Sequence, residues 1–579
     1  MMNTHRKHLL NKSLIGLLVW LTLAIILISV MYLRFDNLNG DTPFGISSSQ
    51  ELSTDPPQYT SFARNKVLFG QWEIFGTRYI TFVKNITTIA AYPIFKIIGT
   101  GRAQSNAVSV LFVFITFIAL FQTWRQKSFN LGLASLAILG FNYIFLSYSK
   151  LSFLEVTTIG MVSLGGYFLL RAENRGISSF VAGAIMAAAA FFSKLLAIVF
   201  LPASLIVVFV EVMQTDKRKI WKALNPLYTF VMGYAFTLII WLLFVYLPSV
   251  KDVSGYMSEI STGLYGAPRA LESVKMFFVW LYSYGFDIRL WTFQPVTFAA
   301  GFLGLSLVTG SILSNKKGFF KKIDRVDLFF LMWFLGVFSI LFPWNYRPLR
   351  YAYLIYPALS YLAARWIIQI SDPDNDWGSR VWPFYLMTAL TASFIGYHFL
   401  IISHFNERSL NIIMQYIPYG LLVGFGIGIV SYILDLAKFT ALAKKNRAFN
   451  NIFLAISISL LLFITIYQLN MYSSHSPKNQ KTIHNASIDL GEILSPDAVI
   501  VGPYSSALTQ DNHFKSTIKM FGVAVPETDF FNKIPATHIA VESGGGEGSS
   551  ELRMAKDYPD LVKSAPIVAT YYIRNIPVN

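Results

Sequence analysis

Residues 105–123 read SNAVSVLFVFITFIALFQT, an apolar stretch that contains no charged side chain. As an α-helix this stretch spans about 28 Å, because each residue adds 1.5 Å, and the hydrocarbon core of a bilayer is ~30 Å thick. The stretch therefore predicts a transmembrane helix.

The composition of the whole chain agrees with that prediction. Its 579 residues are 54% hydrophobic and only 13% charged, and the mean hydropathy is +0.50. A soluble globule of this length needs more polar surface than such a chain can supply. The sequence therefore predicts a polytopic membrane protein.

Apolar stretches of this kind recur along the chain, and we count roughly 13 by the length criterion for membrane helices. They lie near residues 13–33, 105–123, 129–148, 151–170, 178–194, 196–213, 226–247, 291–313, 327–343, 351–369, 381–403, 412–436 and 450–471. The segment 86–99 is shorter and is interrupted by Pro93, which suits an interfacial helix better than a span. The expected fold is an all-α bundle of about 13 transmembrane helices.

The orientation follows from Lys and Arg residues, which gather in alternate connectors. They are Arg6, Lys7, Lys12, Arg125, Lys127, Arg171, Arg175, Lys217, Arg218, Lys219, Lys222, Lys316, Lys317, Lys321, Lys322, Lys444, Lys445 and Arg447. Such residues mark the cytoplasmic side, so the net charge of +16 indicates topology and not a nucleic-acid surface. The N-terminus is expected in the cytoplasm, with the polar pieces 34–104, 248–290 and the tail from 473 outside.

The tail is a different kind of sequence from the rest of the chain. It has short β-rich runs at 498–501, 537–541 and 567–573, and helical patterns at 480–493 and 549–557. We therefore expect two domains, a transmembrane domain over residues 1–472 and a small extracytoplasmic α/β domain over 473–579. The chain has no Cys, which excludes disulfides, thiolate metal sites and cysteine nucleophiles.

The outer loop 34–104 carries a spaced pattern of polar and aromatic residues. It contains Asp55, Tyr59, Arg64, Gly70 and Trp72 in that order. A single acid in a long polar loop is ordinarily solvated, and such a loop is often no more than a cover over the bundle. The spacing is what singles out Asp55.

This spacing resembles the first outer loop of the GT-C glycosyltransferases, the branch typified by protein O-mannosyltransferases and lipid A aminoarabinose transferases. In those enzymes an Asp-Glu pair, a Tyr four residues later, a small residue with Arg, and a Gly-x-Trp occupy the same interval. Pro56 stands where the family has Glu, so one of the two acids is missing. The resemblance covers about residues 13–370 and fades in the last three spans and the tail.

A second pattern, YRPLRY at residues 346–351, precedes a late predicted span. By itself such a pattern is typical of snorkelling anchors or of an aromatic belt at the membrane surface. It also resembles the Arg-Tyr of the same family, which faces the lipid-linked phosphate. The resemblance therefore implies phosphate contacts for Arg347 and Arg350 and a substrate contact for Tyr351.

Two short outer turns carry Lys150 with Glu155, and Lys194. Ionisable groups in or beside spans are expensive and tend to mark pathways or paired sites. A structural ion pair or an interfacial anchor is as open an interpretation here as a catalytic role. Both turns resemble the short outer connectors of the family.

The resemblance implies a polyprenyl-phosphate-sugar donor held in the lipid bilayer, and an extracytoplasmic glycan, lipid or protein as the acceptor. Asp55 would act as the general base while the acceptor attacks opposite the phosphate, which predicts inversion. Cationic side chains would stabilise the departing phosphate. The candidates are Arg64, Lys84, Lys194, Arg347 and Arg350.

Aromatic side chains of the same loops have two open interpretations. Tyr59, Trp72 and Tyr351 either stack on the sugar or pack the core of the loops. Both interpretations explain these residues equally well.

Metal binding and other function classes stay as alternatives. Some relatives hold a metal ion in the second half of this loop, where the present chain reads TFVKN at residues 81–85, so Lys84 would replace the metal. His398 and His404 are isolated, so no metal is assigned, and a divalent metal remains an alternative without a clear ligand set. A lipid-linked glycan flippase or transporter would place paired charges at the bilayer midplane, whereas most charges here lie at the ends of spans. A non-catalytic scaffold that binds through its tail is the other alternative.

Overall fold

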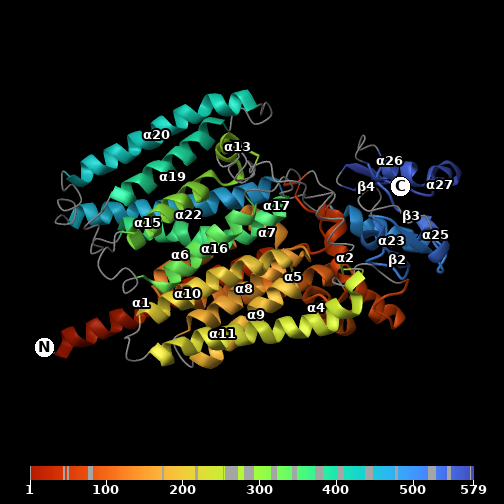
Figure 1. Cartoon of the computed structure of the whole chain (residues 1–579), viewed down its shortest axis with the longest axis horizontal. Helices are drawn as coiled ribbons and strands as arrows, with labels where there is room; N and C mark the ends of the chain where they lie inside the picture. Colours follow the sequence, from red (N-terminus) through yellow and green to blue (C-terminus); the bar gives the residue numbers. More distant parts are fainter. Residues whose placement is uncertain are drawn as a thin grey trace.

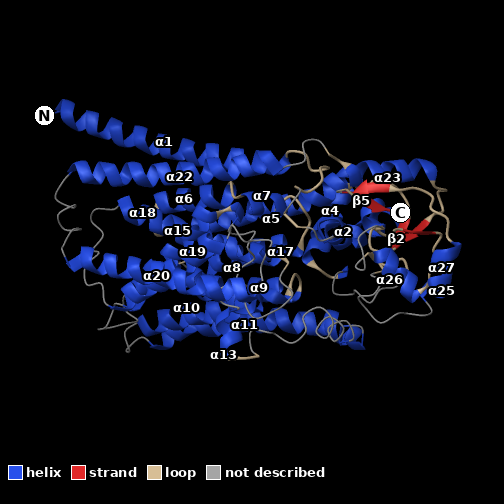
Figure 2. Ribbon diagram, turned by 90° about the horizontal axis from the view of Figure 1, so that it is seen from above, coloured by secondary structure: helices blue, strands red, loops and turns tan. Residues whose placement is uncertain are grey.

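A computed structural model gives the architecture, in which long helices run roughly along one axis and a smaller unit lies at one end (Figure 1). Short strands are found only in that smaller unit among the described residues (Figure 2). The structure describes residues 2–43, 46–47, 51–75, 83–171, 175–214, 220–251, 253–254, 272–279, 292–313, 323–341, 348–371, 382–401, 410–436, 447–475, 480–519, 530–543, 549–573 and 575–579.

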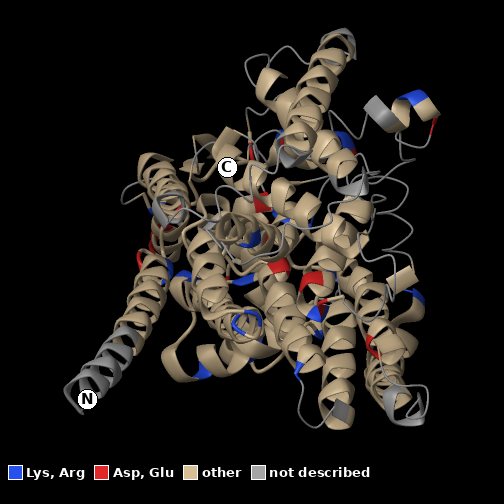
Figure 3. Ribbon diagram, turned by 90° about the vertical axis from the view of Figure 1, so that its left-hand side faces the viewer, with Lys and Arg blue, Asp and Glu red and all other residues tan. Residues whose placement is uncertain are grey.

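Seven of the described helices are long and apolar enough to cross a membrane. They are Gly16–Phe35, Arg102–Trp124, Leu195–Gln214, Leu224–Ser249, Pro295–Leu313, Met414–Ile433 and Asn451–His475. Most of the ribbon carries neither basic nor acidic residues, as expected for helices that face lipid and one another (Figure 3). The prediction of a multi-pass helical membrane protein is confirmed, but the count of about 13 spans is not.

The remaining predicted spans also contain helix, in shorter pieces. The helices before the tail are α1 (Met2–Phe35), α2 (Glu51–Phe69), α4 (Ile86–Ile98), α5 (Arg102–Trp124), α6 (Phe129–Gly140), α7 (Tyr143–Tyr148), α8 (Leu154–Leu170), α9 (Arg175–Phe191), η1 (Leu195–Val199), α10 (Phe200–Gln214), α11 (Ile220–Trp241), η3 (Leu242–Tyr246), η4 (Leu247–Ser249), α13 (Val274–Val279), α15 (Pro295–Leu313), α16 (Arg325–Leu341), α17 (Leu349–Ala352), η9 (Tyr353–Ile355), α18 (Tyr356–Ser371), α19 (Trp382–Ile401), α20 (Leu410–Leu436) and α22 (Arg447–His475).

The predicted span at 129–148 is divided into α6 and α7. The side chain of Asn142 caps α7, because its oxygen accepts a hydrogen bond of 2.9 Å from the backbone N–H of Phe145. At the end of α6, Nη1 of Arg34 donates to the carbonyl oxygen of Gly140 at 3.0 Å. These side chains satisfy backbone groups that the break in the helix exposes, which is required inside a bilayer.

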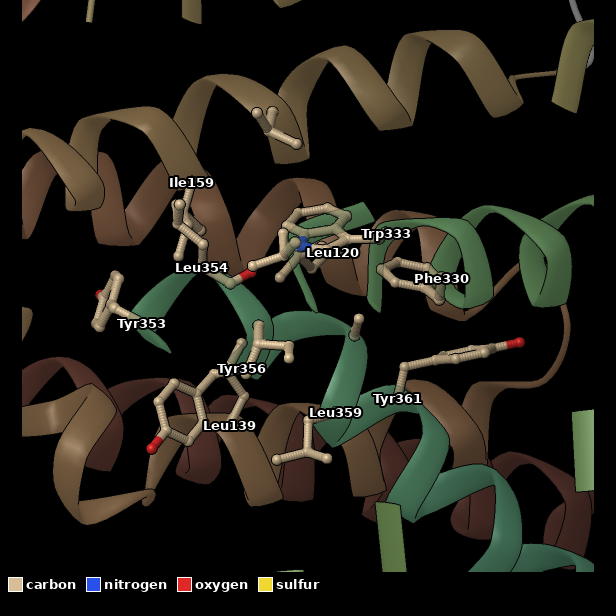
Figure 4. Packing of buried hydrophobic residues seen from close by; sticks show 14 of the residues in the cluster. Leu120, Leu139, Ile159, Phe330, Trp333, Tyr353, Leu354, Tyr356, Leu359 and Tyr361 are labelled. Carbon is tan, nitrogen blue, oxygen red and sulfur yellow. The ribbon is translucent and has the colours of Figure 1, made fainter. Parts of the chain in front are cut away.

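Close packing joins the helices that lead into and out of Arg350. Trp333 of α16 donates its indole N–H to the carbonyl oxygen of Leu354 at 2.7 Å, and the rings of Phe330 and Tyr361 stack with centroids 4.5 Å apart (Figure 4). Lipid is as apolar as these side chains, so van der Waals contact and hydrogen bonds hold such helices together. The short helix α17, which carries Arg350, is therefore fixed against a rigid part of the bundle.

The tail forms its own small α/β unit with a separate hydrophobic core. Among its described residues the strands β2, β1 and β3 form a parallel sheet in that order, and β4 pairs antiparallel with β5. The sheet region expected from the sequence is confirmed, although β2 and β5 were not predicted. Its elements are α23 (Thr482–Ile493), β1 (Val499–Val501), α24 (Ser505–Leu508), β2 (Lys515–Thr517), α25 (Phe530–Lys533), β3 (His538–Ile539), α26 (Ser550–Asp557), α27 (Pro559–Ser564), β4 (Tyr571–Ile573) and β5 (Ile576–Val578).

Candidate active site

The candidate base lies on α2, at the end of the bundle that carries the tail (Figure 1). Glu51, Asp55 and Tyr59 are spaced four residues apart, so they share one face of this helix. The hydroxyl of Tyr59 lies 3.4 Å from Oδ2 of Asp55, and the hydroxyl of Thr54 lies 3.3 Å from Oδ1. The stretch that reads as a polar loop is thus a helix that presents the acid.

Arg350 of α17 joins the two predicted sequence patterns, because its side chain contacts the helix that carries Asp55. Its Nη1 forms an ion pair with Oδ2 of Asp55 and lies 3.3 Å from Oε2 of Glu51. Its Nε lies 3.4 Å from Oε1 of Glu155, which comes from α8. Three carboxylates from two helices therefore converge on one guanidinium, and Arg350 is only 7% exposed.

Lys194 completes this group from the residue before η1. Its ammonium forms an ion pair with Oε1 of Glu155 and lies 3.9 Å from the centre of the Tyr351 ring. The guanidinium of Arg350 lies 5.5 Å from the same ring. Tyr351 is therefore held against two cations through the electron-rich face of its ring.

The group contains more acids than cations among the described residues. Burial raises the pKa of Glu51 to about 7, the charges of Asp55 and Glu155 act in the same direction, and Arg350 and Lys194 oppose them. A carboxyl group that loses its hydration and stands beside other carboxylates favours its neutral form. Glu51 thus titrates near neutral pH within a buried cluster.

Arg64 was predicted to contact the donor phosphate, but the structure directs it toward the tail. It follows Asp55 by nine residues, which turns it by about 180° around α2 and moves it ~13 Å along the axis. Its Nη2 donates to the carbonyl oxygens of Asn512 and Phe514 at 2.7 and 3.1 Å. Burial lowers the pKa of Arg64 to about 10. Its described contacts fit an anchor for the tail.

Two other residues, Lys84 and Arg347, were predicted to contact the phosphate. Lys84 donates to the carbonyl oxygen of Phe244, so its side chain points to η3. The neighbouring Asn85 donates to the carbonyl oxygen of Ser193 at 2.8 Å. Lys84 therefore borders the segment that carries Lys194 without joining the ion pairs described there. Arg347 lies outside the described residues.

Trp72 packs within the loop. Its ring lies 5.3 Å from that of Tyr92, centre to centre, and it belongs to the partly buried residues around the main core. This arrangement matches the packing interpretation of Trp72, whereas Tyr59 and Tyr351 border the cluster itself. Trp72 is not brought to Asp55 by any contact described in the structure.

Sequence reasoning missed Glu51 and noted Glu155 without including it among the site residues. The signal for Glu51 was its position four residues before Asp55, which becomes meaningful only if residues 51–59 are helical. Pro56 and Pro57 lie inside that helix and concealed the helical period.

The carboxylates do not form a metal-binding group. Among the described residues, no group of three or more His, Asp and Glu side chains is placed to hold a metal ion. Glu51, Asp55 and Glu155 instead surround the guanidinium of Arg350.

The tail contacts α2 and α5 directly. Besides Arg64, the carboxylate of Asp511 accepts a hydrogen bond from the backbone N–H of Arg102 at 3.0 Å. Ser61, Asn65 and Ser516 are among the polar residues that line a cleft between α2 and the tail. The helix that carries Asp55 therefore also forms part of the surface on which the tail domain packs.

Comparison with known proteins gives the fold. No protein-family model and no curated protein sequence matches the chain. The crystal structure of ArnT from Cupriavidus metallidurans bound to undecaprenyl phosphate matches with a TM-score of 0.53 and 13% identity, over 97% of each chain. The same protein in the apo state matches with a TM-score of 0.51 and 15% identity, over 96% of this chain and 97% of that one. ArnT is a lipid A aminoarabinose transferase of the GT-C superfamily. The present chain therefore shares its fold with ArnT, a member of the superfamily that its motifs resemble.

Proposed function

We propose that this chain is a membrane glycosyltransferase that transfers a sugar from a polyprenyl-phosphate-linked donor to an extracytoplasmic acceptor, with inversion. The observation that carries the proposal is the contact between Asp55 and Arg350. An acid able to take a proton and a cation able to hold a phosphate meet beside a polar domain, within a fold shared with ArnT. That protein was crystallised with undecaprenyl phosphate.

Arg350 and Lys194 would hold the donor phosphate. Both are cations with little exposure, and both lie against Tyr351, so a phosphate that reached them would lose most of its water. Charged hydrogen bonds to phosphate oxygens are strong in such surroundings. As the bond from the anomeric carbon to the phosphate oxygen breaks, negative charge grows on that oxygen and these contacts strengthen.

Asp55 would act as the base for the acceptor hydroxyl. While it is paired with Arg350, its Oδ2 is occupied by the guanidinium. Transfer of the guanidinium from Asp55 to the donor phosphate would leave Asp55 able to accept the proton. The acceptor oxygen then attacks the anomeric carbon from the face opposite the phosphate, which inverts that centre.

The contacts of the tail suggest where the acceptor enters. Arg64 fixes the tail on α2, and the cleft lined by Ser61, Asn65 and Ser516 lies on the same helix as Asp55. Hydroxyl and amide groups of this kind suit a hydroxyl-rich acceptor. We propose that the tail borders the acceptor path, on the extracytoplasmic side that the positive connectors predict, with the N-terminus in the cytoplasm.

Reconstitution into vesicles tests this function. Purified chain would be supplied with isotopically labelled polyprenyl-phosphate sugars and with lipid and glycan fractions of its source organism, and products would be identified by mass spectrometry. We expect a glycoside of opposite anomeric configuration and free polyprenyl phosphate. Movement of the donor across the bilayer without product would instead support the flippase alternative, and neither product nor movement would support the scaffold.

A further inference from the structure

We propose that Glu51 is a positioning residue for the base, which stands beside Asp55 and increases its affinity for the acceptor proton once Arg350 has engaged the donor phosphate. This inference rests on the proposed function and assigns a role to a residue outside the predicted motif. Position 56, directly after Asp55, is a proline, so the sequence offers no acid there.

The geometry places the two carboxylates next to each other. Glu51 and Asp55 are one helical turn apart on α2, and an oxygen of each contacts the same atom, Nη1 of Arg350. Glu51 is 5% exposed, so little water separates its charge from that of Asp55. Charges in such surroundings interact far more strongly than they do in water.

Groups from several elements face Glu51. Arg350 comes from α17, Asp55 from α2 itself, Glu155 from α8, and Lys194 from the residue before η1. In the resting arrangement the two cations offset part of the repulsion among the three acids. When a phosphate takes both cations, the acids lose that compensation, and one added proton becomes favourable.

Burial raises the pKa of Glu51 to about 7, Arg350 opposes this rise, and the charges of Asp55 and Glu155 add to it. Because Glu51 and Asp55 contact the same atom of Arg350, loss of the charge at residue 51 should change the pH dependence of sugar transfer.

The reaction balances without a bond to Glu51. The O–H bond of the acceptor breaks and its proton passes to Asp55, while the acceptor oxygen forms a bond to the anomeric carbon. The bond from that carbon to the phosphate oxygen breaks, and its electron pair stays on polyprenyl phosphate. Asp55 then returns the proton to water. Glu51 acts only through Asp55.

The test is the pH profile of kcat at saturating donor, which reports groups in the substrate complex. Glu51→Gln removes the charge and keeps the shape of the side chain. We expect its kcat at neutral pH to fall about tenfold and the acidic limb of its profile to move down by about one pH unit, with the donor KM nearly unchanged. Glu51→Asp keeps the charge, so the acidic limb of its pH profile should lie close to that of the wild type.

A matched control is Glu492→Gln, which changes an exposed Glu on α23 of the tail and should leave the profile unchanged. The proposal would be overturned if Glu51→Gln folds and the acidic limb of its pH profile of kcat coincides with that of the wild type. If that variant fails to fold, Glu51→Asp is measured alone: a small downward shift supports the proposal, and a lower kcat without any shift contradicts it. Transfer by the wild type is measured in the same assay, so its absence would refute the proposed function itself, whereas an active wild type with unshifted variants would refute only the role of Glu51.

Discussion

Two ion clusters lie at opposite ends of α16, and they differ in their balance of charge. The Arg350 cluster follows this helix and contains Glu51, Asp55, Glu155, Lys194 and Arg350. The Asp327 cluster lies at its beginning and contains Lys127, Asp324, Asp327 and Arg365, with the hydroxyl of Tyr361 donating to Asp327 at 2.5 Å.

The formal charges of the described residues differ between the two clusters. The Asp327 cluster has two cations and two acids, so its sum is zero. The Arg350 cluster has two cations and three acids, so its sum is −1 when all are ionised. A balanced cluster holds helices together, whereas an unbalanced one is stable only with a proton or a further partner.

The largest effect is expected for Asp55→Asn, which removes the base and keeps the size of the side chain. We expect sugar transfer to fall by about 10³-fold, because general bases contribute on the order of 10² to 10⁴. The folded fraction should change little, since Glu51 and Glu155 still contact Arg350. Initial rates with labelled donor measure the first quantity and size-exclusion chromatography the second. Full activity in this variant would refute the role of Asp55.

For Asp327→Asn we expect a loss of stability with little change in sugar transfer. This change leaves Lys127 and Arg365 without their shared carboxylate in a largely buried position, and breaking such a pair costs roughly 3 to 5 kcal/mol. The apparent Tm in detergent should fall clearly, while the rate per folded molecule stays near that of the wild type. Equal stability with lost transfer would show that both clusters are functional.

Arg350→Lys tests whether the Arg350 cluster needs a guanidinium at this position or only a positive charge. Lysine keeps the charge but cannot contact three carboxylates in a fixed planar arrangement. We expect the donor KM to rise about tenfold and kcat to fall, in assays that vary the donor concentration. Arg365→Lys in the Asp327 cluster is the matched control and should leave the donor KM unchanged.

The pH dependence of protein stability should also distinguish the Arg350 cluster from the Asp327 cluster. The pKa of Glu51 rises from 4.5 to about 7 on folding, so the folded protein binds more protons than the unfolded chain between these values. The stabilising contribution is therefore complete below pH 4.5 and disappears as the pH rises through 7. The Tm of Glu51→Gln relative to the wild type should increase from about pH 5 to about pH 8. A constant difference across this range would contradict the raised pKa.

Local signals in the sequence predicted much of the fold and less of the site. Apolar stretches such as 105–123 reveal helices because length and hydropathy are properties of one segment. The meeting of Asp55 with Arg350 joins residues 295 positions apart and was expected only from the resemblance. Glu51 was missed because two prolines suggested a loop, and β2 was missed because its sequence, Lys515–Thr517, is polar and short.

Arg64 contacts the tail in the structure, although its motif predicts a phosphate contact, and it supports the smallest predicted effect. The motif suggests a phosphate contact, whereas its hydrogen bonds reach carbonyl groups of the tail. Arg64→Lys keeps the charge but loses the planar donor that serves Asn512 and Phe514 together. We expect limited proteolysis to cleave the tail up to about fivefold faster, because the loss of one hydrogen bond weakens docking by about 1 kcal/mol. The donor KM should not change. A rise in donor KM comparable with that of Arg350→Lys would mean that Arg64 turns from the tail to the phosphate during the reaction, and would extend the Arg350 cluster along α2.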